Sequence, residues 1–194
     1  CYDSKIFNIM KNLLILFVSV LFISCGDSPS QKKETVVTIP DSLKSTTIEG
    51  EEILMGKITL AQLDLFSPWY AKEYEFYKTN ASKTEEIKPL LKDISFVLLM
   101  GTWCEDSQRE VGGMLKILEA AGYPINSIEI IAVSEDKDTP NGLEKPFDLY
   151  NVPTLIFKKD GKEMNRIVEF PIQTLEQDML EILKGNPYKN AYSE

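Results

Sequence analysis

The stretch that most constrains the fold is an apolar run at residues 94–100, which leads into a lone cysteine and then a helix. The run has the length of a buried strand, and Gly101 after it can begin a turn. A helix is predicted next, because apolar side chains fall at i, i+3, i+4 and i+7: Val111, Met114, Leu115 and Leu118. The strand therefore passes abruptly into the helix, and we expect Cys104 at or near the helix N-terminus.

A thiol in that position is well placed to act as a nucleophile. The unpaired N–H groups and the dipole at a helix N-terminus stabilise a thiolate. Most free cysteines are instead buried small hydrophobes. Here the neighbours Glu105, Asp106, Ser107 and Gln108 are polar, as at a solvent-facing helix start, and Trp103 offers an apolar wall. We therefore expect the Cys104 thiol to be exposed or partly exposed.

The residues around this cysteine resemble the Trp-Cys-x-x-Cys motif of the thioredoxin family. Trp103 and Cys104 match the motif, and Ser107 stands where the family has its second cysteine. The family often has a buried acid six residues before the first cysteine, and Leu98 occupies that position here. Both departures bear on how well the chain could reduce disulfides.

A second segment extends the resemblance, which covers residues 94–184. Val152, Pro153 and Thr154 resemble the family's Val-Pro-Thr segment, whose proline is cis and faces the active cysteine, and a predicted hairpin follows it. The resemblance implies an α/β, thioredoxin-like three-layer fold, in which helices flank a mixed central sheet. It also implies that Trp103, Val152, Pro153 and Thr154 contact a bound substrate.

Local patterns predict the remaining elements. Residues 53–58 could form a strand, and residues 128–133 predict a strand parallel to the one at 94–100. A capping box at Thr59 and Gln62, and Ser67 before Pro68, predict helix starts in an N-terminal helical extension at residues 51–93. Further helices are predicted from residue 82, shortened by a proline, and from residue 174. The aromatic residues of the extension are expected to pack in the core: Trp69, Tyr70, Tyr74, Phe76 and Tyr77.

The first 24 residues have the pattern of a signal peptide. A largely apolar run of 12 residues at 13–24 follows a lysine, and such a run is shorter than the roughly 20 residues that span a bilayer. We expect translation to start at Met10, with residues 1–9 an artefact. Residues 22–25 resemble a bacterial lipoprotein box, which implies that Cys25 is lipidated. The alternative is an ordinary cleaved signal with an incidental cysteine.

The domain organisation follows from this segment. Residues 25–50 are polar and are expected to form a lipidated, flexible tether, and residues 51–194 the thioredoxin-like domain. Cys104 would then be the only free thiol of a protein anchored to a bacterial membrane, facing the periplasm or the exterior. The expected partners are envelope proteins with thiols or disulfides, an external resolving thiol and the membrane itself.

Composition excludes several classes of function. The net charge of −9 disfavours a nucleic-acid partner. The chain has no histidine, so it has no Ser-His-Asp or Cys-His arrangement and no His-ligated metal. We expect neither a metal nor another cofactor.

The sequence thus leaves two main hypotheses. In the first, Cys104 is a single nucleophile for thiol–disulfide exchange, and an outside thiol must resolve the mixed disulfide because Ser107 cannot. Ser107 could then donate a hydrogen bond to the thiolate, or it could be a capping or first-turn serine. In the second, the chain is a non-catalytic peptide-binding module. A peroxide-reacting thiol is a weaker third hypothesis, because peroxiredoxins would need threonine where Gly101 stands.

Overall fold

The structure, a computed structural model, describes residues 36–193. The predicted signal peptide, Cys25 and the first part of the predicted tether lie outside the described residues. Among residues 36–193, no helix is both long enough and apolar enough to cross a membrane.

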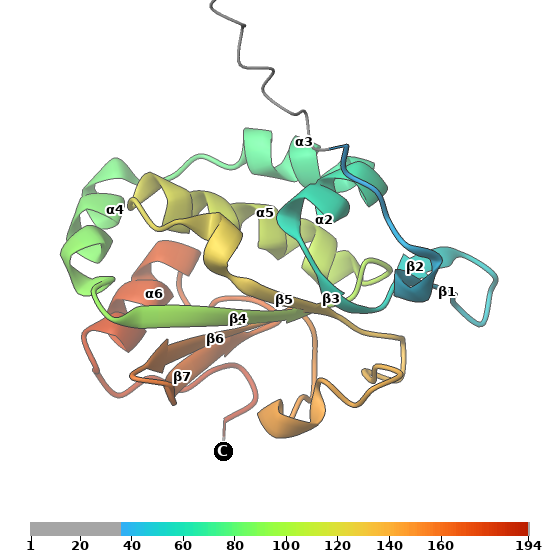
Figure 1. Ribbon diagram of the computed structural model, residues 1–194. Helices are drawn as coiled ribbons and strands as arrows, with labels where there is room; N and C mark the ends of the chain where they lie inside the picture. Colours follow the sequence, from blue (N-terminus) through green and yellow to red (C-terminus); the bar gives the residue numbers. More distant parts are fainter. Residues whose placement is uncertain (1–35, 194) are drawn as a thin grey trace, which may run out of the picture. The chain divides into compact units, whose positions relative to one another are not determined.

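A five-stranded mixed sheet forms the centre of the fold (Figure 1). Its strands lie in the order β3 (Gly56–Ile58), β5 (Glu129–Ala132), β4 (Ile94–Met100), β6 (Thr154–Lys159) and β7 (Lys162–Val168). β4 and β5 are parallel, and the other neighbours are antiparallel. β6 and β7 are joined at Asp160 and Gly161, which both have the positive φ of a tight hairpin turn. The predicted central strand, its parallel partner and the hairpin are confirmed.

Several helices begin at residues whose side chains cap them. The helices are α2 (Leu60–Phe66), α3 (Pro68–Phe76), α4 (Ala81–Ile87), α5 (Glu105–Ala120) and α6 (Leu175–Leu183), with short 3-10 turns η1 (Asp41–Leu43), η2 (Lys88–Leu90), η3 (Ile125–Ser127) and η4 (Lys145–Phe147). The capping box of Thr59 and Gln62 is present, and Pro68 is the first residue of α3. α4 begins earlier than predicted, because the Asn80 side chain caps it. As predicted, a proline shortens α4, which passes into η2.

The two faces of the sheet are covered differently, because successive side chains of β4 point to opposite sides. On one side, Phe96, Leu98 and Met100 join a large apolar cluster with residues from α2 to α6, and we call this the helical face. On the other side, Val97 and Leu99 join a smaller cluster with Cys104. Partly buried side chains pack over this cluster, two of them from the 134–153 segment that contains η4. We call this the loop face. Helices flank the sheet as predicted, and the layer on the loop face is thin.

Most of the predicted aromatic core lies on the helical face. Tyr70 is buried, and Trp69, Tyr74 and Tyr77 pack half-buried against the large cluster. Phe76 is 67% exposed, so its predicted burial is wrong. It is the last residue of α3, where the chain leaves the helix and its packing.

The chain is in regular structure before residue 51. β1 (Lys44–Thr46) pairs antiparallel with β2 (Glu52–Leu54), so this part of the predicted tether is folded. Leu43 packs against the large cluster, and the Leu54 N–H donates to the Thr102 hydroxyl at 3.1 Å. The single strand predicted at 53–58 is divided at Met55 into β2 and β3, and Gly56, the first residue of β3, has a φ of +97° that favours glycine.

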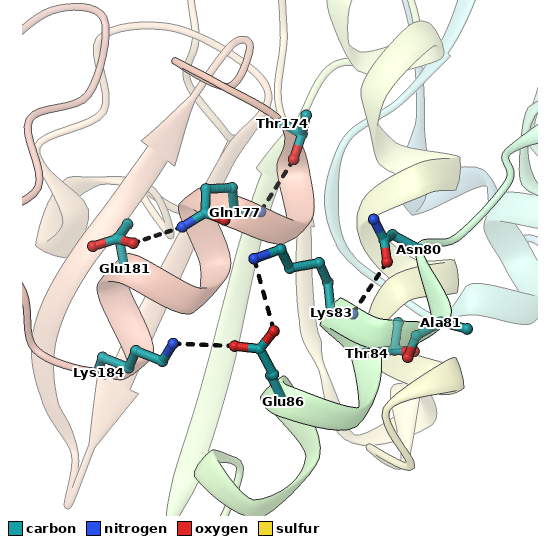
Figure 2. A network of polar contacts seen from close by, with 9 residues as sticks. All are labelled: Asn80, Ala81, Lys83, Thr84, Glu86, Thr174, Gln177, Glu181 and Lys184. Atoms are coloured by element: carbon teal, nitrogen blue, oxygen red, sulfur yellow. Dashed lines mark hydrogen bonds and ion pairs between the residues drawn. The ribbon is translucent and has the colours of Figure 1, made fainter.

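Polar side chains join α4 to α6 on the helical face (Figure 2). The Glu86 carboxylate forms an ion pair with Lys83 at 3.7 Å within α4, and it accepts a hydrogen bond from Lys184 after α6 at 3.3 Å. The Thr174 hydroxyl caps α6 by accepting the Gln177 N–H at 3.2 Å. Of these contacts, only the pair of Glu86 with Lys184 joins the two helices.

Candidate thiol site

Cys104 is the N-cap residue of α5, as the sequence predicts. Its N–H donates to the Gly101 carbonyl at 3.2 Å, and its own carbonyl accepts the Gln108 N–H at 3.0 Å. The free N–H groups and the positive dipole end of this 16-residue helix therefore lie beside the cysteine.

The Cys104 side chain is turned onto the loop face. It is only 9% exposed, and it packs in the smaller cluster with Val152 and Trp103. The thiol donates to the Val152 carbonyl, with 3.2 Å between Sγ and O. The expectation of an exposed or partly exposed thiol is therefore wrong. Polarity of the first helical turn did not determine the burial of the N-cap side chain, which points back to the sheet.

Ser107 has a structural hydrogen bond rather than a bond to the thiol. Its side chain is fully buried, and its hydroxyl accepts the Gly101 N–H at 3.2 Å. The bond closes the turn between β4 and α5, so Ser107 acts as a first-turn serine, one of the two roles considered from the sequence. No hydrogen bond joins Ser107 to Cys104 among the described residues.

Trp103 forms one wall of the site. Its indole N–H donates to the Val133 carbonyl at 2.9 Å, which fixes the half-buried ring against the end of β5. A Cβ at Gly101 would lie 2.6 Å from two atoms of this ring. Glycine is therefore required at the turn if the indole is to lie where it does.

The loop before β6 forms the opposite wall. The peptide bond between Val152 and Pro153 is cis, as the resemblance implied, and both residues are buried. Val152 presents its carbonyl to Cys104, whereas the Pro153 carbonyl accepts the Glu169 N–H at 2.7 Å. The Thr154 hydroxyl donates to the Asn151 carbonyl at 2.7 Å. The structure thus brings Cys104, Trp103 and Val152 together and places Pro153 and Thr154 behind them.

The charges at the start of α5 partly cancel. Arg109 forms ion pairs with Asp106 and Glu110. Hydrogen bonds from its guanidinium to Glu110 and then Asp106 raise the pKa of Arg109. Because the Asp106 charge is paired, it opposes a nearby thiolate less than a free carboxylate would.

Other features of the site bear on its chemistry. Leu98 is fully buried on the helical face. Cys104 is a free cysteine, and no group of three or more Asp, Glu, Cys or His side chains within residues 36–193 could hold a metal ion. The chemistry that the described site offers is that of one thiol.

The sequence analysis missed the residues beyond the cis-proline loop. Glu169 and Phe170 directly follow β7. The Tyr192 hydroxyl donates a hydrogen bond to Glu169, and the Tyr192 ring contacts the ring of Phe170. Nothing in the local pattern marks these positions, because the contacts join residues that are distant along the chain.

Together, the order of the five strands, a cysteine starting the helix after β4 and a cis proline before β6 give a thioredoxin-like fold. No protein-family model matches the sequence, and no curated protein is significantly similar to it.

Solved structures are similar at low identity. A protein of unknown function from Pseudomonas aeruginosa is 15% identical with a TM-score of 0.51, over 66% of this chain and 93% of that chain. An HIV epitope scaffold is 14% identical with a TM-score of 0.50, over 68% and 94%. A thioredoxin variant from Halobacterium salinarum is 16% identical with a TM-score of 0.34, over 50% and 78%. These likenesses concern the fold alone.

Proposed function

We propose that this chain is a thioredoxin-like protein whose single nucleophilic cysteine, Cys104, performs thiol–disulfide exchange with protein or low-molecular-weight disulfides. One observation carries the proposal: the Cys104 thiol lies between the N-terminus of α5 and the Val152–Pro153 loop. The helix N-terminus favours the thiolate, and a thiolate is the species that attacks a disulfide.

The exchange consists of one displacement. The Cys104 thiol gives up its hydrogen bond to Val152, loses its proton to solvent and attacks one sulfur of the substrate disulfide. A new S–S bond forms, the substrate S–S bond breaks, and the other substrate sulfur leaves as a thiolate. No electrons are gained or lost overall.

The product is a mixed disulfide that the site cannot resolve by itself. Ser107 has no thiol, and its hydroxyl is engaged with Gly101. An external thiol must therefore attack the mixed disulfide and release Cys104. In this proposal Trp103 and the backbone of Val152, Pro153 and Thr154 form the surface that the substrate contacts.

A non-catalytic peptide-binding module is the second candidate. It is favoured by the low exposure of Cys104, 9%, and by the thiol's hydrogen bond to the Val152 carbonyl, which a thiolate could not donate. In such a module the thiol would only fill space, and a Cys104→Ser variant would keep its partner.

We further propose that the protein is lipid-anchored through Cys25 in a bacterial cell envelope. The apolar run at residues 13–24 and the lipoprotein-like residues 22–25 support this. Envelope proteins with thiols or disulfides would then be its substrates. The mass of the N-terminal peptide of the mature protein tests the anchor, since a cleaved and unmodified Cys25 would contradict it.

The experiment that tests the exchange measures a Cys104 adduct. The full chain with Cys1→Ser and Cys25→Ser is treated with glutathione disulfide, and peptides are mapped by mass spectrometry. We expect one glutathione on Cys104, stable until an external thiol is added. In a Ser107→Cys variant the adduct should be released without added thiol. Absence of any adduct on the folded chain, with normal labelling after unfolding, would favour the binding module.

A further inference from the structure

The segment after α6 returns to the end of β7, next to the cis-proline loop. The Tyr192 hydroxyl donates a hydrogen bond to the Glu169 carboxylate, and the Tyr192 ring lies 6.5 Å from the ring of Phe170. Glu169 in turn donates its N–H to the Pro153 carbonyl at 2.7 Å. Tyr192 is therefore connected to the cis-proline loop through a single residue.

Polar and charged neighbours shift the pKa of Tyr192. The hydrogen bond to Glu169 is the main cause of the raised pKa of Tyr192, and the Asp106 carboxylate at the start of α5 adds to the rise. A hydrogen bond from the Asn151 side chain lowers the same pKa. The Tyr192 hydroxyl is thus placed at the end of β7, where Glu169 also holds the cis-proline loop.

A hollow of about 230 Å³ remains between this segment and the sheet. Tyr150, Thr154 and Val168 line it from the loop face, and Asn190, Tyr192 and Ser193 line it from the returning segment. Thr154 directly follows Pro153, so the hollow lies next to the proposed substrate surface. The returning segment covers the hollow without filling it.

The returning segment is held at its base and loosely beyond it. The Tyr188 hydroxyl donates to Asp178 at 2.8 Å, and the Tyr188 carbonyl accepts from the Asn165 side chain at 2.9 Å. Tyr192, by contrast, is 50% exposed. Residues with few buried contacts open at low free-energy cost. Residues 190–193, which we call the strap, can therefore leave while Tyr188 stays in place.

We propose that the strap occupies the substrate-binding surface beside Cys104, and that a polypeptide substrate with a tyrosine-like side chain enters by displacing Tyr192. Glu169 would accept a hydrogen bond from the incoming hydroxyl, and Phe170 would contact the incoming ring. The proposal rests on the function proposed above, because it names the substrate class and the control of the same site.

Rates of adduct formation on Cys104 test the strap. The full chain with Cys1→Ser and Cys25→Ser is compared with its Tyr192→Ala and Tyr192→Phe variants, and with Phe76→Ala as the matched control on the helical face. Each reacts with hydroxyethyl disulfide and with two symmetric peptide disulfides. One peptide has a tyrosine two residues after its cysteine, and the other has alanine there.

We expect Tyr192→Ala to react about tenfold faster with the tyrosine peptide. A closed state lowers the apparent affinity in proportion to the fraction of molecules that are open, and removing Tyr192 raises that fraction. Tyr192→Phe should lie between the two, and Phe76→Ala should match the parent. The gain should be smaller with the alanine peptide and with hydroxyethyl disulfide. Equal rates for Tyr192→Ala and the parent with the tyrosine peptide would overturn the proposal.

A second readout separates failure of the strap from failure of the thiol chemistry. Trypsin cleaves after Lys189, at the base of the strap, and a cysteine-free tyrosine peptide should speed this cleavage if it displaces Tyr192. If no variant forms an adduct with any disulfide but the peptide still speeds cleavage, the exchange function is wrong and the strap is retained. If the peptide leaves cleavage unchanged, the strap proposal is wrong whatever Cys104 does.

Discussion

The helical face and the loop face of the central sheet differ in the thickness of the layer that covers them. On the helical face, alternate residues of β4 are covered by five helices, and an ion pair joins Glu86 of α4 to Lys184, which directly follows α6. On the loop face, the residues between them are covered by Trp103, Phe147 and Leu149, and the cluster includes Cys104. The comparison teaches that the helical face provides most of the packing, whereas the loop face, with its thinner cover, holds the Cys104 thiol.

A matched pair of leucines tests this difference most strongly. Leu98 and Leu99 are adjacent and both fully buried, but they point to opposite faces. Leu98→Ala should lower the free energy of unfolding by about 4 kcal/mol and Leu99→Ala by about 3 kcal/mol, because the thin layer can relax into the cavity. Urea unfolding measures both. A larger loss for Leu99→Ala would contradict the comparison.

Alkaline pH should have the next largest effect, by lowering the free energy of unfolding through tyrosines on the helical face. Burial, with smaller contributions from Asp64 and Glu119, raises the pKa of Tyr70 to about 12, and burial is also the main cause of the raised pKa of Tyr74 and of Tyr77. Since these values exceed the unfolded value of about 10, their stabilising effect is complete below that pH and is lost as pH rises towards the folded-state values.

Urea unfolding at about pH 8 and about pH 11 should therefore show lower stability at the higher pH. The Tyr70→Phe variant should show a smaller loss, since phenylalanine does not ionise. An unchanged pH dependence in this variant would exclude Tyr70 as a source of the effect.

The turn between β4 and α5 depends on Ser107. Ser107→Ala should cost about 1–2 kcal/mol, because the buried Gly101 N–H loses its acceptor. The exposed Ser127, changed to alanine, is the control and should cost less. Because Ser107 does not contact the thiol in our account, Ser107→Ala should still form the Cys104 adduct. Loss of the adduct in a stably folded variant would assign Ser107 a part in the exchange.

The ion pairs on the helical face should matter least. Lys184 and Glu86 have side chains that are 42% and 43% exposed, so Lys184→Ala should change stability by about 0.5 kcal/mol or less. Thr174→Ala at the cap of the same helix should cost about 1 kcal/mol. A larger effect of Lys184→Ala than of the cap variant would show that the Figure 2 contacts act as a network.

The regular elements could be predicted because their signals are local. β4 follows from an apolar run, α5 from the spacing of Val111 and Met114, and the β6–β7 hairpin from Asp160 and Gly161. The position of Cys104 at the helix start follows from the same patterns.

The burial of Cys104 could not be predicted in this way. It depends on Val152, 48 residues away, whose carbonyl accepts from the thiol. The contact of Tyr192 with Glu169 likewise joins residues 23 apart that no pattern relates. Sequence periodicity indicates which face of an element is apolar, but it does not indicate how thick a layer covers that face.

The most direct test of the central claim compares the reactivity of Cys104 in the folded and unfolded chain. With Cys1→Ser and Cys25→Ser, Cys104 is the only thiol, and the rate of its reaction with hydroxyethyl disulfide is measured at neutral pH with and without urea. We predict that the folded chain reacts at least as fast as the unfolded chain, because the start of α5 favours the thiolate. Reaction only after unfolding would contradict the account, since the fold would then protect the thiol rather than use it.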